Sequence, residues 1–185
     1  MSLTLTVTPI HGVCVVHRTP ITDERGSFQR LFDLAELDGL SAIGTTFQVN
    51  HVRTASAGTV RGLHIQMPPH SETKLVSCIR GAVFDVAVDL RGGSPTFGRW
   101  FGQKLSATNN AALLIPEGCA HGVQSLQDNS EIVYVHSAAY EPGSESGLSP
   151  SDSKVAIEWP LPVANLSKRD SLCRMSLMDF SEVDW

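Results

Sequence analysis

Residues 60–76, VRGLHIQMPPHSETKLV, carry two histidines, a glutamate and a lysine around a proline-rich loop, which is unusual polarity for a sheet interior. Side-chain alternation along the first strand-like run would put His64 on the face opposite Arg61. Lys74 begins the next run, so a hairpin would bring its ammonium near His64. Such a pair can perform acid/base chemistry, whereas His70, inside the loop, is typical of solvated surface. Alternation alone leaves a solvent-facing His64 equally open.

Two later segments carry further polar groups in strand-like contexts. In LLIPEGCAHGVQSL, His121 stands between Ala120 and Gly122, and these small neighbours leave room for a ligand against the imidazole. In EIVYVHSAAY, alternation places Tyr134 and His136 on one face. A hydrogen-bonded core histidine and a core tyrosine are the structural alternatives, and these segments alone do not decide between them.

A metal site is another interpretation of these histidines, because small jelly rolls often hold a metal on histidines and a carboxylate. A typical metal-binding cupin has a second histidine two residues after the first, and Gln66 occupies that place here. The following region offers only His70 and Glu72, in the proline-rich loop. We therefore expect no metal.

The elements that must position these groups are predominantly strands. In AVFDVAVDL, apolar residues alternate with Asp85 and Asp89 at the two-residue period of a strand. Helix signals are limited to residues 34–41 and the late segment LSKRDSLCRMSLMDF. We predict an all-β jelly roll, one domain over residues 1–185, whose two sheets enclose a cavity. The other predicted strands lie in LTVTPI, VCVVHR, GSFQRLF, TTFQVNHVR, VRGLHIQ, KLVSCIRG, GRWFGQKLS, ALLIPEG, HGVQSLQ and EIVYVHSAA.

Composition excludes several classes of function. The chain of 185 residues is 42% hydrophobic and has a formal net charge of -5, with scattered Lys and Arg, which argues against nucleic acid or an anionic membrane as partner. No apolar run approaches the ~18 residues that cross a bilayer, and the N-terminus lacks an export signal. Cys14, Cys78, Cys119 and Cys173 are isolated, and we predict reduced core residues of a cytoplasmic protein.

A longer series of motifs surrounds these residues. In order and spacing the series resembles dTDP-4-dehydrorhamnose 3,5-epimerases over roughly residues 10–172. The resemblance implies a cupin-type jelly roll, a nucleotide-sugar substrate, no metal or other cofactor, and a homodimer that exchanges N-terminal strands. The motifs are DERGSF, FQVNHVR, VRGLHIQ, TKLV, RGAVFDVAVDLRGGSPTFGRW, IPEGCAHG, the Tyr134 strand and LSKRD.

The resemblance also implies roles for individual residues. His64 would be the general base, paired with Asp170, and Tyr134 would be the general acid. Lys74 would hold the developing enolate oxygen, with His121 beside it. The matching nucleotide-sugar-binding positions are Arg25, Phe28, Gln48, Asn50, Arg61, Glu145 and Arg169, the last of which stands where the family more often has lysine.

The implied chemistry needs these residue types. A hydrogen next to a ketone is weakly acidic, so its removal requires a base and stabilisation of the negative charge on the ketone oxygen. Neutral His64 suits the first task and the ammonium of Lys74 the second. Asp170 would fix the imidazole tautomer. Inversion requires a proton to return to the opposite face of the same carbon, and the phenol of Tyr134 is chemically suited to donate it.

The sequence departs from the family at three places. Arg30 occupies a position where the family commonly has a glutamate that contacts the nucleotide, so a cytidine, guanosine or uridine diphosphate sugar rivals the thymidine form. Ser146 and Ser149 replace an arginine and a tryptophan that lie near the sugar in the family. A different sugar, or inversion of only one of carbons 3 and 5, is therefore an alternative. The tail, residues 173–185, runs beyond the family core.

Three rival functions follow from these observations. The first is a monoepimerase that inverts carbon 3 or carbon 5 alone. The second is a cupin that binds sugar nucleotides without catalysis, which would need neither a base nor an opposed acid. The third is a metal-dependent cupin oxygenase or isomerase, which Gln66 disfavours.

Overall fold

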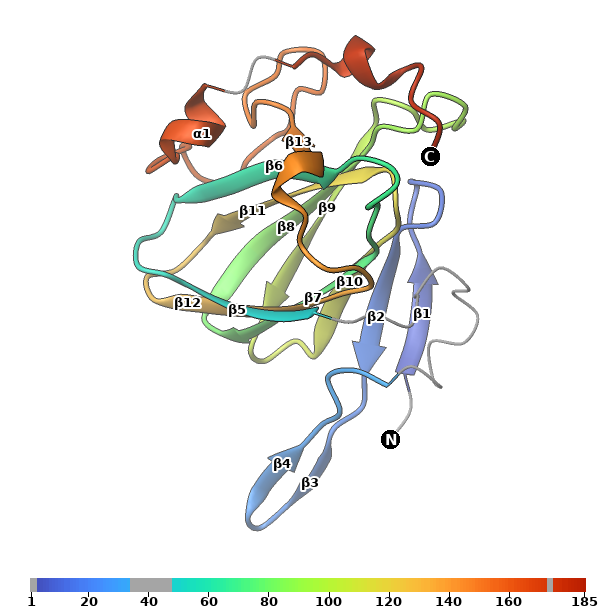
Figure 1. The fold of residues 1–185 in the computed structure, drawn as a ribbon. Coiled ribbons are helices and arrows are strands. Elements are labelled where there is room, and N and C mark those ends of the chain that lie inside the picture. The colour runs from blue at the N-terminus through green and yellow to red at the C-terminus, as the bar shows by residue number, and fades with distance from the viewer. Residues whose placement is uncertain (1–2, 34–47, 173–174) are drawn as a thin grey trace.

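Two antiparallel sheets face each other in the computed structural model, which describes residues 3–33, 48–172 and 175–185 (Figure 1). The six-stranded first sheet has the order β1 (Leu3–Val7), β2 (Cys14–Arg18), β10 (Ala111–Ile115), β7 (Lys74–Arg80), β12 (Ser130–His136), β5 (Gln48–Thr54). The five-stranded second sheet has the order β13 (Glu145–Gly147), β6 (Val60–Gln66), β11 (Cys119–Ser125), β8 (Ala82–Asp89), β9 (Trp100–Ser106). The predicted all-β jelly roll is confirmed.

The proline-rich loop after β6 crosses from one sheet to the other. The hairpin predicted between β6 and β7 is wrong, since β6 pairs with β11 and β13, whereas β7 pairs with β10 and β12. Prolines cannot donate ladder hydrogen bonds, so this loop does not continue the pairing. Lys74 therefore stands on the wall opposite His64 and reaches the same cavity from the other side.

Apolar side chains from both sheets fill the space between them. Val76 and Leu113 of the first sheet belong to one buried cluster with Val83 and Ala87 of the second. On β8 the predicted two-residue period is confirmed, because Val86 instead joins a separate cluster on the outer face of the second sheet. The chemistry-bearing residues lie beside the inner cluster, since Val123 and Ile132 belong to both the cluster and the cavity lining.

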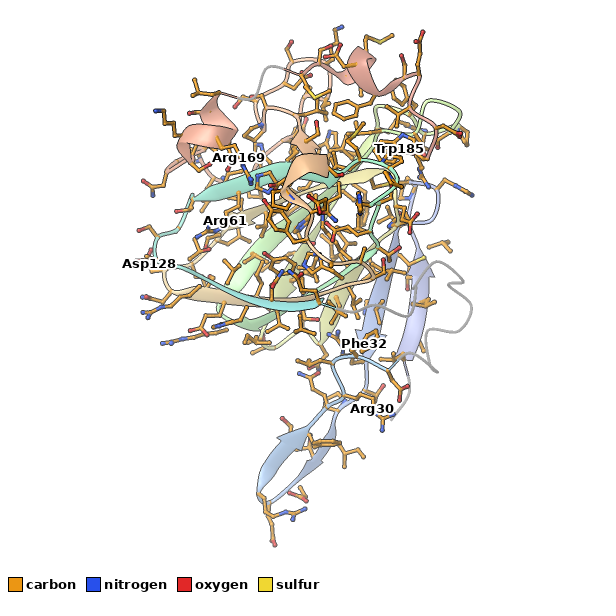
Figure 2. All side chains as sticks on the ribbon, viewed as in Figure 1. Arg30, Phe32, Arg61, Asp128, Arg169 and Trp185 are labelled. Carbon is orange, nitrogen blue, oxygen red and sulfur yellow. The ribbon has the colours of Figure 1, made fainter. Side chains whose placement is uncertain are left out.

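The chain after β13 covers the outer face of the second sheet. The short helix α1 (Lys168–Ser171) and the 3₁₀ turn η3 (Leu177–Phe180) confirm the helical turns predicted in this region. Leu177 and Phe180 are buried in the outer cluster, and the Trp185 indole Nε1 donates to the Leu90 carbonyl at 3.2 Å (Figure 2). The tail therefore completes the core. The helix predicted at residues 34–41 lies outside the described residues.

Cysteine positions agree with the prediction as far as they are described. Cys14, Cys78 and Cys119 are buried and free, and Cys173 lies outside the described residues. Burial raises the pKa of Cys78 to about 11 and that of Cys119 to about 12, so both stay as thiols. Within residues 3–33, 48–172 and 175–185, no helix is long and apolar enough to span a membrane.

A small hairpin projects away from the two sheets (Figure 1). It consists of β3 (Ile21–Asp23) and β4 (Gly26–Phe28), and all of its strand residues are exposed. Of the predicted strand GSFQRLF, only the first three residues form one. The hairpin carries Arg25 and Phe28, two residues that the family resemblance assigns to substrate binding. A second 3₁₀ turn, η2 (Pro142–Ser144), precedes β13.

We expect Phe180→Ala to lower the free energy of unfolding by roughly 3–5 kcal/mol, because it removes a fully buried ring from the cover of the second sheet. Met178→Ala, on the same turn, should cost less than about 0.5 kcal/mol because the Met178 side chain is exposed. Urea unfolding of both variants measures the difference. Equal stabilities would show that the tail is not part of the core.

Candidate active site

An irregularity in β6 sets the direction of the side chains that enter the cavity. The register between β6 and β11 shifts: His64 pairs with His121, and Arg61 pairs with Val123. β6 therefore has one more residue than β11 between these two pairs. This extra residue places Arg61 and His64 in the same cavity, and the prediction that they face opposite ways is wrong. At Gly62 φ is +116°, and a Cβ there would lie 2.6 Å from the His121 carbonyl oxygen, so glycine is required.

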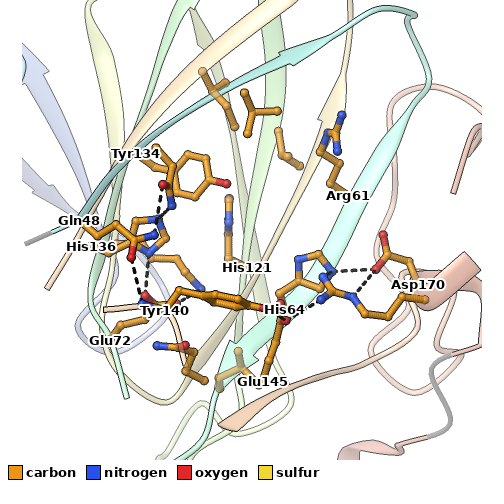
Figure 3. Close-up of a pocket in the computed structure, with 18 of the residues that line it drawn as sticks. Gln48, Arg61, His64, Glu72, His121, Tyr134, His136, Tyr140, Glu145 and Asp170 are labelled. Atoms are coloured by element: carbon orange, nitrogen blue, oxygen red, sulfur yellow. Dashed lines mark hydrogen bonds and ion pairs between the residues drawn. The ribbon is translucent and has the colours of Figure 1, made fainter. Parts of the chain in front are cut away.

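His64 and Asp170 form a hydrogen-bonded pair between β6 and α1 (Figure 3). His64 Nε2 lies 2.7 Å from Asp170 Oδ1, and the side chains are 30% and 4% exposed. Ser167 caps α1 by accepting from the Asp170 amide, which fixes the start of that helix. Burial raises the pKa of Asp170, but hydrogen bonds from His64, Ser167 and the Gly62 backbone outweigh it and hold the pKa below its ordinary value.

The guanidinium of Arg169 lies beside this pair. Arg169 Nη2 is 2.9 Å from His64 Nε2, and Arg169 Nη1 donates to Glu145, which also accepts from the Tyr140 hydroxyl. Nε2 cannot donate to Asp170 and accept from Arg169 at once. We infer that His64 carries its hydrogen on Nε2 and donates it to Asp170. The Asp170 carboxylate is buried, so water cannot replace this bond, whereas the guanidinium of Arg169 is partly exposed to water. The second ring nitrogen, Nδ1, then carries the lone pair of the neutral imidazole.

His121 stands directly across from His64 in the pairing of β11 with β6. Its Nε2 lies 2.8 Å from Oδ1 of Asp85, a fully buried carboxyl on β8. Burial raises the pKa of Asp85, opposed by the charge of His121 and its hydrogen bond. The pair holds the His121 ring in the cavity wall. This contact explains why the inner face of β8 carries the carboxylate of Asp85.

Tyr134 enters the cavity from β12, on the opposite sheet from His64. Its ring centroid is 6.3 Å from that of His121 and 4.6 Å from that of His136. Burial raises the pKa of Tyr134, and the charges of Glu72 and Glu145 raise it further, against the charge of Arg61. The phenol therefore keeps its proton at neutral pH and is able to donate it.

Lys74 lies in a buried cluster of ionisable groups on the same wall as Tyr134. Lys74 Nζ is 3.0 Å from Glu72 Oε1, and the side chains are 7% and 8% exposed. The other Glu72 oxygen is 2.7 Å from Nδ1 of His136. An ammonium held inside a largely buried pocket can stabilise negative charge that develops on a nearby oxygen.

One cavity of about 600 Å³ collects nearly all of the predicted site residues (Figure 3). The predicted residues in its lining are Gln48, Asn50, Arg61, His64, Lys74, His121, Tyr134, Glu145, Arg169 and Asp170. Arg25 and Phe28 are absent from the lining because the hairpin that carries them points away from the sheets. The cavity combines a carboxylate-paired imidazole on one wall with a protonated phenol and an ammonium on the other.

The departures from the family pattern lie around this cavity rather than in its lining. Ser146 lines an adjoining cavity, which shares His64 and Arg169 with the first. Ser149 lines neither cavity. Arg30 is paired with Asp33 at 2.7 Å near the base of the β3–β4 hairpin (Figure 2).

Gln66 is held by the backbone of neighbouring loops. Its amide nitrogen donates to the carbonyls of His70 and Ala139, and its amide oxygen accepts from the backbone of Glu141. This side chain therefore ties together the loops after β6 and β12 beside the cavity. His70 is exposed, as predicted.

Four residues of the cavity or its support have no predicted role in catalysis or substrate binding, and these are Glu72, Asp85, His136 and Tyr140. His136 stands two residues after Tyr134 in β12, so the two-residue period places it on the same face. Glu72 lies in the loop before β7, where periodicity gives no signal. Asp85 alternates with the apolar residues of β8, but its contact with His121 depends on which strand lies next to β8. Tyr140 follows β12 in a loop, where periodicity gives no signal.

The depressed pKa of Asp170 makes part of the stability depend on pH. A carboxyl with a lower pKa in the folded state stabilises the fold above its unfolded pKa of about 4, and this contribution is lost as pH falls through the folded pKa. Asp170→Asn should therefore lose less unfolding free energy than the wild type when urea unfolding is compared between pH about 5 and 3. Asp184→Asn, at an exposed position, is the control and should keep the wild-type slope. An unchanged acid slope in Asp170→Asn would contradict an ionised, paired Asp170.

Comparisons with known proteins identify the family of this chain. The family model for dTDP-4-dehydrorhamnose 3,5-epimerase matches residues 7–176. An enzyme of that name from Shigella flexneri is 40% identical, covering 88% of this chain and 90% of that protein. A dTDP-4-dehydrorhamnose 3-epimerase from Streptomyces niveus is 38% identical over 87% and 78%. A Legionella pneumophila dTDP-6-deoxy-D-glucose-3,5-epimerase, solved with dTDP-4-keto-L-rhamnose, has a TM-score of 0.88 and 35% identity over 98% and 95%. The chain belongs to the dTDP-4-dehydrorhamnose 3,5-epimerase family.

Proposed function

We propose that this protein inverts carbons 3 and/or 5 of a nucleotide-linked 4-keto-6-deoxyhexose, by removing a proton next to the ketone and returning it through an enolate. One observation carries the proposal: the His64–Asp170 pair and the Tyr134 phenol enter a single cavity from facing sheets. Binding alone needs neither a base nor an opposed acid, so this arrangement argues against a non-catalytic sugar-nucleotide binder.

Removal of the proton falls to His64. Asp170 accepts the Nε2 hydrogen, which leaves the Nδ1 lone pair to take the substrate proton and stabilises the imidazolium that results. The electron pair of the broken C–H bond moves onto the ketone oxygen as an enolate. The Lys74 ammonium and His121 stabilise that charge from the cavity wall.

Return of a proton to the opposite face completes the inversion. We assign this step to Tyr134, and the support is that it projects from β12 on the first sheet, whereas His64 projects from β6 on the second. Its raised pKa keeps the phenol protonated until the enolate forms. The enolate pair takes the phenol proton at carbon, and the two catalytic groups return to their starting states through solvent.

The number of carbons that are inverted separates the two leading functions. The Shigella flexneri 3,5-epimerase and the Streptomyces niveus 3-epimerase are 40% and 38% identical to this chain, so similarity favours neither. Ser146, in the adjoining cavity, keeps the monoepimerase under consideration. We propose that the sugar is linked to thymidine diphosphate, as it is in the Legionella pneumophila complex. Because Arg30 stands where the family commonly has a glutamate that contacts the nucleotide, other nucleotides are also worth testing.

The proposed roles predict different behaviour for two variants. His64→Ala should abolish exchange of substrate hydrogens with deuterated water at every carbon, with a loss in rate of at least about 10²-fold. Tyr134→Phe should retain some exchange but block completed inversion, because the base still forms the enolate. Proton NMR follows exchange, and a coupled reductase or chromatography of the product follows inversion. Full-rate inversion by Tyr134→Phe would rule out the phenol as the acid.

We further propose a homodimer in which the β3–β4 hairpin of one subunit reaches the cavity of the other. The support is that the hairpin projects from the body, that Phe28 is 62% exposed, and that neither Arg25 nor Phe28 reaches the cavity of its own chain. Exposed aromatic side chains on a projecting arm are typical of contact surfaces.

The buried free cysteines support a reducing, cytoplasmic location.

Complementation tests this arrangement of subunits. His64→Ala and the double variant Arg25→Ala, Phe28→Ala should each be inactive alone. Coexpression should restore about a quarter of the wild-type activity, because half of the dimers are mixed and each mixed dimer holds one intact site. Recovery would fail if the hairpin served its own chain, since every cavity would then lack either the base or the arm.

A further inference from the structure

Three ionisable side chains meet where the first sheet lines the cavity, and each is almost fully buried. Glu72 lies between Lys74 and His136, with one carboxylate oxygen 3.0 Å from the ammonium and the other 2.7 Å from the imidazole Nδ1. The three side chains are 7–8% exposed. Removing such groups from water is costly unless every partner is satisfied, so their directions of hydrogen bonding are constrained.

A chain of hydrogen bonds that begins at a backbone amide fixes those directions. The Tyr140 N–H can only donate, so Gln48 presents its amide oxygen to it at 3.0 Å. Gln48 Nε2 then donates to Asn50 Oδ1 at 3.2 Å. Asn50 Nδ2 must in turn donate to His136 Nε2, at 3.2 Å. His136 is thereby left with its hydrogen on Nδ1, which it donates to Glu72.

This orientation assigns the charges in the cluster. His136 is neutral because Nε2 serves as an acceptor, and Glu72 is a carboxylate that accepts from both neighbours. Burial alone would raise the pKa of Glu72, but the hydrogen bond from His136 and the charge of Lys74 outweigh it and lower the pKa. The other titratable groups around the ammonium come from β8, β11 and β12 and are Asp85, Cys119, His121 and Tyr134.

We propose that Glu72, oriented by His136, is a positioning residue that holds Lys74 as an ammonium aimed into the cavity. Glu72 supplies a negative charge 3.0 Å from the ammonium, and its hydrogen bond with His136 holds the carboxylate in that orientation. Of the carboxylates that the structure describes around Lys74, Glu72 is the one within ion-pair distance of its nitrogen. The inference rests on the proposed function, because Lys74 matters to catalysis only where an enolate forms.

The first test reads the tautomer of His136 in the wild-type protein and needs no activity. Histidine is labelled with ¹⁵N, and two-bond ¹H–¹⁵N correlations at pH 7.5 report which ring nitrogen carries hydrogen. The His136 signals are identified by their absence in His136→Gln. We expect neutral imidazole with hydrogen on Nδ1. Hydrogen on Nε2, or an imidazolium, would overturn the assigned direction of the chain and with it the proposal.

The second test removes the charge of Glu72 while keeping its shape. For Glu72→Gln we expect kcat for hydrogen exchange to fall roughly 10- to 100-fold with KM changed less than about threefold, because the loss acts on the enolate rather than on binding. The alkaline limb of the pH–rate profile should move to lower pH by about one unit or more, because the buried ammonium has lost its counter-charge. Glu72→Asp, which keeps the charge, should retain the wild-type alkaline limb.

Controls separate this inference from the proposed function. Glu158→Gln removes an exposed carboxylate from the surface and should leave both kcat and the pH profile at wild-type values. If the wild type exchanges hydrogen and Glu72→Gln does so with the same kcat and alkaline limb, the positioning role of Glu72 is wrong and the proposed function stands. If the wild type exchanges none, the proposed function fails, whereas the tautomer of His136 still tests the hydrogen-bond chain.

Discussion

The hydrogen bond between His64 and Asp170 is the interaction on which the organisation of the site depends. It joins a strand of the second sheet to a helix more than a hundred residues later in the chain, so it exists only if the C-terminal segment is folded onto that sheet. Leu177 and Phe180 secure that segment by burial against the outer face. Catalytic geometry and core packing are therefore coupled through one short helix.

Charge compensation explains how so many ionisable groups fit between two apolar sheets. His121 is paired with Asp85, Lys74 with Glu72, and His64 with Asp170, so each of these three basic side chains in the cavity is paired with a carboxylate. Burying a charge without a partner would cost several kcal/mol, roughly the whole margin of stability of an ordinary domain. The pairs also fix the side chains in place, which favours reaction at a defined position.

The sequence predicts the strands and most of the cavity lining, and its failures have physical causes. Periodicity places Tyr134 and His136 together correctly because β12 pairs regularly with β7 from Ile132 to His136. It fails at Arg61, where the irregular pairing beside Gly62 adds a residue. It also fails for the partners of β6, because neighbours within a sheet depend on how the chain crosses between sheets. Asp170 becomes a partner of His64 only through family resemblance, since no local pattern links α1 to β6.

Contacts that depend on tertiary structure are likewise invisible to local patterns. The link between Asp85 and His121 requires β8 and β11 to be neighbours, and the hydrogen-bond chain through Gln48 and Asn50 requires β5 to lie beside β12. Resemblance supplied Arg25 and Phe28 as binding residues, yet the fold of one chain holds them away from its own cavity. That separation is the physical reason for expecting a second subunit at the site.

The most direct test of the account is proton NMR of the purified protein in deuterated water with dTDP-4-keto-6-deoxyglucose, following the sugar signals at carbons 3 and 5. We expect time-dependent loss of the signal at one or both carbons, because deuterium from solvent replaces the hydrogen removed by the base. Retention of both signals with this substrate and with its cytidine, guanosine and uridine analogues would contradict proton abstraction as the function of this site.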